Sequence, residues 1–87
     1  MKKEIIDFWA DGCGNCKMIE PALAQIEQEF PDIKITKMNI KDHEDEVVKY
    51  GVSSLPTLVF VKDGEEVAKM MGLKPKSLII KKIQEVF

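Results

Sequence analysis

Residues 7–17 read DFWADGCGNCK and carry both cysteines of this 87-residue chain. The first half of this stretch closes a short apolar run, which predicts a buried strand over residues 4–9. The second half opens a segment whose apolar residues recur every three or four positions, as on one face of a helix: Ile19, Leu23, Ile26 and Phe30. A helix is therefore expected over residues 15–30, with the two cysteines where the strand meets the helix.

Outward from this junction, the pattern predicts a small α/β sheet. Strands are expected over residues 33–40, 57–61 and 66–71, a helix with an acidic first turn over 42–50, and a last helix opened by Pro75. Asp63 and Gly64 form a hairpin turn signal between the last two strands. The order gives a right-handed βαβ unit followed by a hairpin and a covering helix. The expected fold is a four-stranded mixed sheet flanked by three helices.

Length and composition narrow the classes of protein. The chain is long enough for one domain only, residues 1–87. Its net charge is −2, and all 13 basic residues are lysines. No basic excess and no arginine argue against a nucleic-acid partner. No apolar run is long enough to cross a membrane, and the N-terminal run is broken too early for a secretory signal, so we expect a cytoplasmic protein.

The two cysteines allow several interpretations. A structural disulfide between them would close a four-residue loop and contribute roughly 2 kcal/mol, against about 4.7 kcal/mol for a 100-residue loop. A zinc or iron–sulfur site needs two more soft ligands, and His43 is the only further candidate, so zinc would have to bridge two chains. Haem attachment needs a histidine after the second cysteine, where Lys17 stands. We therefore expect no metal and no other cofactor.

Thiol–disulfide exchange explains the placement of the cysteines better. A thiolate at a helix N-terminus faces unpaired backbone N–H groups and the positive end of the helix dipole, which stabilise it. Cys13 should lie just before the helix and be exposed. Cys16, one turn further along, can reach back to it. This arrangement provides a nucleophile and a resolving thiol. Asn15 between them offers a further backbone donor and a side-chain amide near Cys13.

With these residues in view, the chain resembles thioredoxins over essentially its whole length. The matching stretches are residues 7–11, 13–17, 50–58 and 62–65, with Gly72 at the expected distance. The resemblance implies a thioredoxin fold with strands in the spatial order two, one, three, four. It also implies a monomer that reduces disulfides in protein substrates through Cys13 and Cys16. A thioredoxin reductase-type electron donor would recycle the pair.

The resemblance also gives roles to two charged residues. Asp7 would be the buried aspartate that shuttles a proton for the second thiol, and its apolar surroundings should raise its pKa. An edge position, where the carboxylate reaches water, is the alternative. Lys37 would be the lysine near that aspartate, although without the resemblance it is an ordinary solvated strand residue.

The remaining site residues are expected to bind substrate. The resemblance implies a cis peptide bond before Pro56, although only about 5–6% of X–Pro bonds are cis in general. Backbone groups around it, especially at Leu55, would then dock an extended substrate segment. Trp9 is expected both to pack in the core and to form part of the active-site wall. Gly12 and Gly72 complete the substrate surface.

The chain departs from the usual thioredoxin pattern in three ways. It starts directly at the strand before the cysteines, without the usual extra strand and helix, as glutaredoxins and small archaeal-type disulfide reductases do. Gly12 replaces the usual tryptophan, and Asn15 replaces the usual proline. A glutathione-dependent, glutaredoxin-like enzyme is one alternative, although the lack of arginine and the single Gly72 count against it. The other alternative is a non-catalytic thioredoxin-fold binding module.

Overall fold

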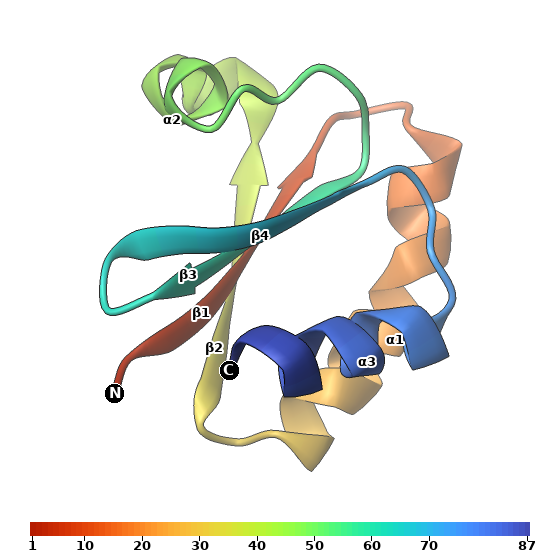
Figure 1. The fold of residues 1–87 in the computed structure, drawn as a ribbon. Coiled ribbons are helices and arrows are strands. Elements are labelled where there is room, and N and C mark those ends of the chain that lie inside the picture. The colour runs from red at the N-terminus through yellow and green to blue at the C-terminus, as the bar shows by residue number, and fades with distance from the viewer.

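The computed structural model describes residues 1–87. Four strands and three α-helices follow one another as in Figure 1, with one short 3₁₀ turn, η1. Their bounds are β1 Lys3–Trp9, α1 Gly14–Glu29, β2 Ile33–Asn39, η1 Ile40–Asp42, α2 Glu44–Lys49, β3 Thr57–Lys62, β4 Glu65–Met71 and α3 Lys76–Val86. The predicted elements are all present, and most of their ends agree within one or two residues.

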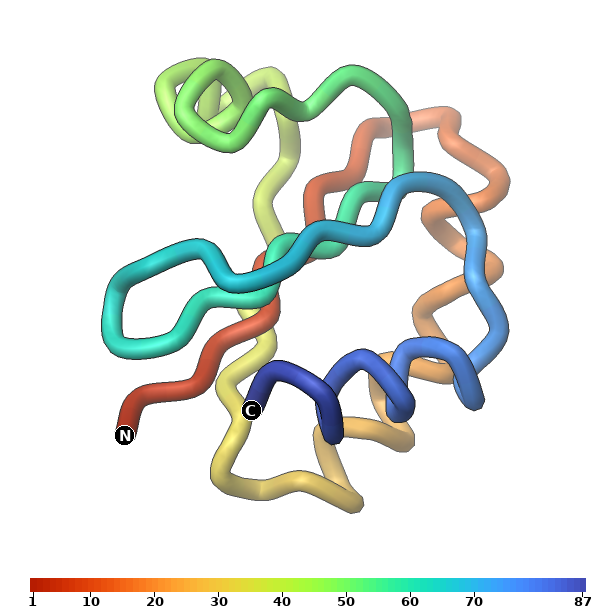
Figure 2. Tube along the Cα trace, viewed as in Figure 1, coloured from red at the N-terminus to blue at the C-terminus, as the bar shows by residue number.

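The four strands form one mixed sheet in the order β2-β1-β3-β4, which confirms the expected order. β1 runs parallel to β2 and antiparallel to β3, and β4 pairs antiparallel with β3. Figure 2 follows the chain from β1 through α1 to β2 and then through α2 into the β3–β4 hairpin. β1 therefore has a hydrogen-bonded neighbour on each side, and its side chains alternate between the two faces of the sheet.

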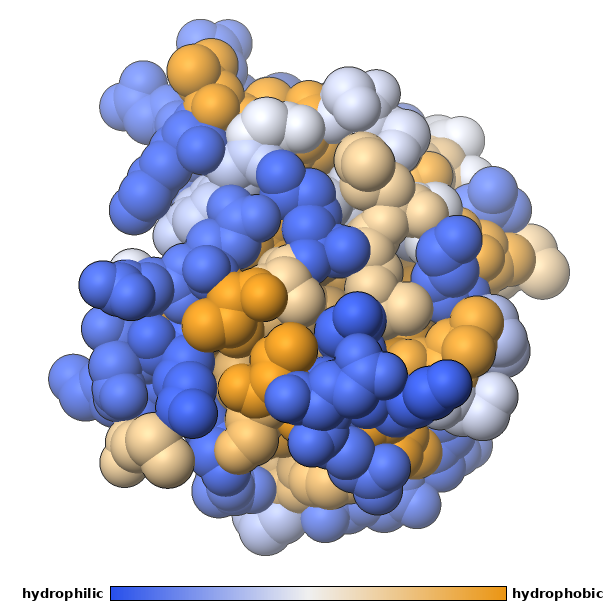
Figure 3. Space-filling model, viewed as in Figure 1, coloured by the Kyte–Doolittle hydropathy of each residue, from blue (hydrophilic) through white to orange (hydrophobic).

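Alternation along β1 supplies both layers of the core. Ile5 belongs to the larger cluster, which the apolar residues of α1 and α3 cover. Ile6 and Phe8 belong to the smaller cluster on the opposite face, beside Tyr50. On the outer side of β4 and α3, apolar groups are interrupted by hydrophilic side chains (Figure 3). No helix of the structure is both long and apolar enough to cross a membrane.

The hairpin turn between β3 and β4 confirms its sequence signal. Asp63 has φ 51° and Gly64 has φ 86°, so both central residues are in the left-handed region that a type I′ turn requires. Asp63 also accepts a hydrogen bond from the backbone N–H of Lys2 at 2.8 Å. This bond ties the N-terminus to the end of the sheet that lies away from the cysteines.

The helix predicted over residues 42–50 is wrong in part. Residues 40–42 form η1, and α2 covers only Glu44–Lys49. The side-chain oxygen of Asn39 accepts the N–H of Lys41 at 3.2 Å and caps the short turn. His43 then has φ −137° and ψ 49°, which are not helical angles. The sequence predicts one continuous helix here, because capping by the Asn39 side chain leaves no hydrophobic pattern along the chain.

We predict that truncation of Ile26, which is fully buried between α1 and the sheet, strongly destabilises the fold. Ile26→Ala should lower the free energy of unfolding by about 2–5 kcal/mol, because it removes buried methyl groups and leaves a cavity. Val48→Ala is the control, since Val48 is 80% exposed on α2 and its truncation should change stability by less than about 0.5 kcal/mol. Urea unfolding of both variants measures this difference, and equal losses would contradict the assigned core.

Candidate active site

The two cysteines lie where β1 passes into α1, as the sequence predicts. Cys13 is the N-cap of α1, with φ −85° and ψ 105°, and Cys16 lies within the first turn. The two sulfurs form a disulfide, and their Cα atoms are 5.3 Å apart. Cys13 is partly exposed, whereas Cys16 is only 3% exposed. One sulfur can therefore meet a partner from outside, and the other can be reached only through the first.

The cap provides a hydrogen-bond donor for the Cys13 sulfur. The backbone N–H of Cys16 donates to Cys13 Sγ across 3.2 Å. An N–H at this position stabilises negative charge on that sulfur when the pair is reduced. The donor expected from Asn15 makes no such bond: neither its backbone N–H nor its side-chain amide donates to Cys13 Sγ, and Asn15 is exposed. Donation by residue 16 is the ordinary N-cap geometry, in which the capping side chain accepts from the third residue along.

Gly12 shapes the turn that delivers Cys13 to the helix. Residues 10–13 form a turn closed by the N–H of Cys13, which donates to the carbonyl of Ala10 at 3.3 Å. Gly12 is the third residue of this turn and has φ 79°. A positive φ at this position is the mark of a type II turn and favours glycine. The sequence identified Gly12 as a departure from the thioredoxin pattern but not the backbone angle behind it.

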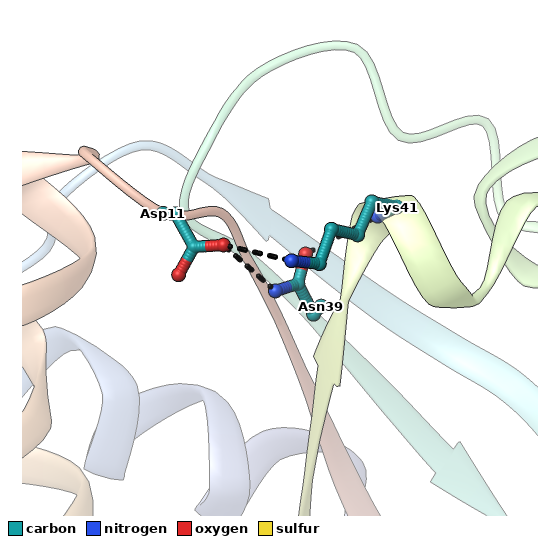
Figure 4. Close-up of polar contacts among 3 residues, drawn as sticks. All are labelled: Asp11, Asn39 and Lys41. Carbon is teal, nitrogen blue, oxygen red and sulfur yellow. Dashed lines mark hydrogen bonds and ion pairs between the residues drawn. The ribbon is translucent and has the colours of Figure 1, made fainter.

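Asp11, in the same turn, forms a polar cluster with Asn39 and Lys41 that the sequence does not predict. Figure 4 shows the Asp11 carboxylate facing Lys41 and Asn39. Asp11 Oδ2 lies 3.2 Å from Lys41 Nζ and 3.5 Å from Asn39 Nδ2. The hydrogen bond and the charge of Lys41 lower the pKa of Asp11. Asn39 is paired with Trp9 in the β1–β2 register, so only the register could have revealed this contact.

The loop before β3 and the end of β4 lie at the same end of the sheet as the cysteines. Phe8 of β1 pairs with Thr57 of β3, and Thr57 pairs with Met71 of β4, so the residues that follow or precede them share one edge. The peptide bond between Leu55 and Pro56 is cis, as expected.

Backbone groups at this edge differ in their availability. Gly72, with φ 88°, donates its N–H to the carbonyl of Pro56 at 2.7 Å, which holds the two loops together. Neither the N–H nor the carbonyl of Leu55 forms a backbone hydrogen bond within the protein, and Leu55 is half-buried. Leu55 therefore carries a free donor and a free acceptor beside the cis proline.

Asp7 is a buried carboxylate in the middle of the sheet. It is 1% exposed, so the alternative of an edge position is wrong: β1 has a partner strand on both sides. It lies on the face of Ile5, toward α1 and α3, and its Oδ1 has no hydrogen-bond partner. Burial raises the pKa of Asp7 from 3.8 to about 6; Lys37 acts against this rise and Glu20 adds to it. The carboxyl group can thus gain and lose a proton near neutral pH.

Lys37 lies beside Asp7 but does not form a salt bridge with it. The two residues are direct partners in the parallel β1–β2 register, which places their side chains on the same face. Lys37 is exposed, and its Nζ lies 4.0 Å from Glu20 Oε1 on α1. Both expectations for Lys37 are therefore partly met, because it is solvated and also acts electrostatically on Asp7. Glu20 was not identified from the sequence, where it reads as a polar helix position.

Trp9 lies at the boundary between the core and the active-site turn. It is the last residue of β1, directly before the turn that carries Cys13, and it is partly buried. Its indole Nε1 is buried without a hydrogen-bond partner. The residue is thus partly buried and directly precedes the turn that carries Cys13.

Comparison with known proteins agrees with this geometry. The thioredoxin family model matches residues 1–85. The chain belongs to the thioredoxin family. Thioredoxin from Chlamydia caviae is 47% identical over 81 residues, which cover 93% of this chain and 79% of that protein. Thioredoxin from Bacillus subtilis is 46% identical over 76 residues, which cover 86% of this chain and 73% of that protein.

Solved structures show the same fold. Mitochondrial thioredoxin 3 from Saccharomyces cerevisiae, in its oxidised form, superposes with a TM-score of 0.90 at 33% identity, over 97% of this chain and 78% of that one. The thioredoxin fold predicted from the sequence is therefore confirmed. Together with the Cys13–Cys16 pair, membership of the family makes this chain a thiol–disulfide oxidoreductase. Membership also implies disulfide-containing protein substrates and a reductase that supplies electrons.

We predict that the backbone angle of Gly12 makes the turn intolerant of a side chain. Gly12→Ala should lower the free energy of unfolding by about 1 kcal/mol, although no atom obstructs the new methyl group, because alanine disfavours a positive φ. Gly14→Ala is the matched control, since Gly14 is helical and equally unobstructed. It should leave stability unchanged or slightly raised. Chemical denaturation compares the two, and an equal response would contradict the proposed role of φ.

We also predict a pH-dependent gain in stability for Asp7→Asn. The pKa of Asp7 is higher in the folded chain, about 6, than its ordinary 3.8, so ionised Asp7 disfavours the folded state. The unfavourable contribution is absent below pH 3.8 and complete above about pH 6. Two pKa units correspond to about 3 kcal/mol, so the variant should be more stable by about 1–3 kcal/mol above pH 6. Unfolding at both pH values tests this, and a loss of stability above pH 6 would contradict it.

Proposed function

We propose that Cys13 is the attacking thiol and Cys16 the resolving thiol of a protein disulfide reductase. The observation that carries this assignment is the contrast between the partly exposed N-cap sulfur of Cys13 and the buried sulfur of Cys16. The Cys13 thiolate attacks one sulfur of a substrate disulfide, forms a mixed disulfide, and releases the other sulfur as a thiolate that takes up a proton. The N–H of Cys16 stabilises the attacking thiolate beforehand.

Asp7 is proposed to accept the proton that Cys16 loses in the second step. Cys16 and Asp7 both belong to the layer between α1 and the sheet. The deprotonated Cys16 attacks Cys13 Sγ, the Cys13–Cys16 bond forms, and the substrate leaves with its second sulfur reduced. The substrate disulfide gains two electrons and the cysteine pair loses two. A carboxylate whose pKa is about 6 can accept this proton at neutral pH and release it to solvent afterwards.

The substrate is proposed to bind along the edge formed by the loops around Pro56 and Gly72. The free N–H and carbonyl of Leu55 can pair with an extended substrate segment, as in strand addition. Pro56 and Gly72 fix the position of that segment through their mutual hydrogen bond. Trp9, at the end of β1, and the exposed Gly12, which leaves open space beside Cys13, complete the proposed substrate surface.

The remaining expectations from the sequence form part of the same proposal. The chain acts as a single-domain monomer in the cytoplasm, where an exchange-active pair can be kept reduced. A thioredoxin reductase-type protein returns two electrons to the Cys13–Cys16 disulfide. Neither nucleic acid nor membrane is a partner, in keeping with a net charge of −2 and the absence of arginine.

The roles of the two cysteines predict different failures on substitution. Cys13→Ser should lose insulin reduction above the background of dithiothreitol alone, because the remaining thiol of Cys16 is buried and cannot reach a substrate disulfide. Cys16→Ser should still attack but should accumulate as a stable mixed disulfide, since resolution is lost. In the reduced wild type, iodoacetamide should label Cys13 before Cys16 because of its exposure. Turbidity follows insulin reduction, gel shifts detect the mixed disulfide, and peptide mapping identifies the labelled cysteine.

The alternatives give other results. Residual insulin reduction by Cys13→Ser equal to the wild type would favour a binding module. Recycling by glutathione rather than by a reductase protein would favour a glutaredoxin-like enzyme. Preferential labelling of Cys16 would reverse the proposed roles.

A further inference from the structure

Lys37 has two acidic neighbours, and only one of them forms an ion pair with it. Asp7 is its direct partner in the β1–β2 register, whereas Glu20 lies on α1, which crosses the same face of the sheet. The ammonium group lies 4.0 Å from Glu20 Oε1 and forms no salt bridge with Asp7. Asp7 Oδ1 remains buried without a hydrogen-bond partner. The lysine thus lies beside the buried carboxylate and pairs with the exposed one.

A pocket of about 160 Å³ lies between α1 and β2, and Glu20 and Lys37 both line it. Its lining includes Glu20 and Glu27 from α1 and Lys37 from β2, with apolar residues between them. Glu20 and Lys37 are both more than half exposed, so their charges stay hydrated at the outer side of this layer. A shift of the ammonium from Glu20 to Asp7 would remove it from water, and this desolvation opposes the attraction.

We propose that Glu20 is a positioning residue: it holds the Lys37 ammonium at the outer side of the α1–β2 layer and so keeps Asp7 free to accept a proton near neutral pH. Without Glu20, the Lys37 ammonium would lose its ion-pair partner and would favour the ionised Asp7 carboxylate at lower pH. An exposed ion pair is weak, but it is enough to bias a flexible lysine between two partners. This inference rests on the role proposed for Asp7 in resolving the mixed disulfide.

Few other charged groups can act on Asp7. Lys37 from β2 and Glu20 from α1 act on it. α1 also carries the buried Cys16, whose thiol titrates in the reduced protein. β3 places the apolar Leu58 opposite it, and α3 turns isoleucines toward this layer. Glu20 and Lys37 are therefore the two exposed charges that influence the protonation of the buried Asp7 carboxyl group.

The test is a carbon-13 NMR titration of the Asp7 carboxyl group in the oxidised protein, where no thiol titrates. In the wild type its midpoint should lie at about pH 6. Glu20→Gln should lower the midpoint by a few tenths of a pH unit, and Glu20→Lys should lower it further. Glu27→Gln is the matched control, since it lines the same pocket but forms no salt bridge with Lys37. Its midpoint should equal that of the wild type.

A double-variant cycle separates action through Lys37 from a direct effect of Glu20 on Asp7. Lys37→Met alone should raise the midpoint, because it removes the positive charge. In the Lys37→Met background, Glu20→Gln should lower the midpoint by less than half of its effect in the wild-type background. An unchanged midpoint in Glu20→Gln, or an equal shift in both backgrounds, would overturn the proposal.

Kinetics distinguish this inference from the proposed function beneath it. Single-turnover release of the mixed disulfide should become faster below pH 6 in Glu20→Gln, in step with the larger ionised fraction of Asp7. If the titration shifts as expected but Asp7→Asn resolves the mixed disulfide at the wild-type rate, the role of Asp7 fails while the coupling stands. If Asp7→Asn is slow but Glu20→Gln leaves the titration unchanged, the coupling alone fails.

Discussion

The central position of β1 in the sheet is the constraint on which the rest of the structure depends. A strand with partners on both sides has no side chain at an edge, so each residue must face one of the two helical layers. Alternation then sends Ile5 and Asp7 toward α1 and α3, and Ile6 and Phe8 toward α2. The same strand ends beside the start of β3 and the end of β4. One strand thereby buries the carboxylate and brings the cysteine turn to the cis-proline edge.

Burial of the Asp7 carboxylate is energetically unfavourable, and an apolar residue at this position would avoid that cost. A carboxylate without a hydrogen-bond partner is unfavourable in a buried layer, and its raised pKa expresses that cost. The apolar residues around it make up the larger core cluster, which supplies the surplus stability. A neutral residue would pack as well but could not exchange protons with a thiol in the same layer. The proton transfer proposed between Cys16 and Asp7 would account for this cost, which the fold itself does not require.

Sequence patterns predicted the elements well because periodicity reports burial directly. The apolar run before Trp9 indicates a strand buried on both faces. The spacing of Ile19, Leu23 and Ile26 indicates which face of α1 packs on the sheet. They failed at residues 40–43, where the side chain of Asn39 and the angles of His43 decide the backbone. Such local capping leaves no periodic trace.

Those parts of the site that lie in local motifs, or that the thioredoxin resemblance implies, were predictable from the sequence. The Cys13–Cys16 motif is local, and the cis bond at Pro56 came from the resemblance, because its base rate alone argued for trans. Contacts between elements were not predictable in this way. Asp11 meets Lys41 across the β1–β2 register, and Glu20 meets Lys37 across the helix–sheet layer. Both pairs join polar residues that lie far apart in the sequence, and no pattern along the chain connects their members.

The turn at Gly12 shows how one departure from the family pattern can be absorbed. The usual tryptophan is absent, yet Cys13 still occupies the N-cap, because backbone bonds and not an indole ring set its position. The turn closes through its own hydrogen bond, Gly12 supplies the positive φ, and the Asp11–Lys41 contact fixes the preceding residue. A side chain restored at Gly12 would therefore act first on the turn and only second on the surface presented to partners. The backbone angle, more than the missing ring, determines which residues this position can accept.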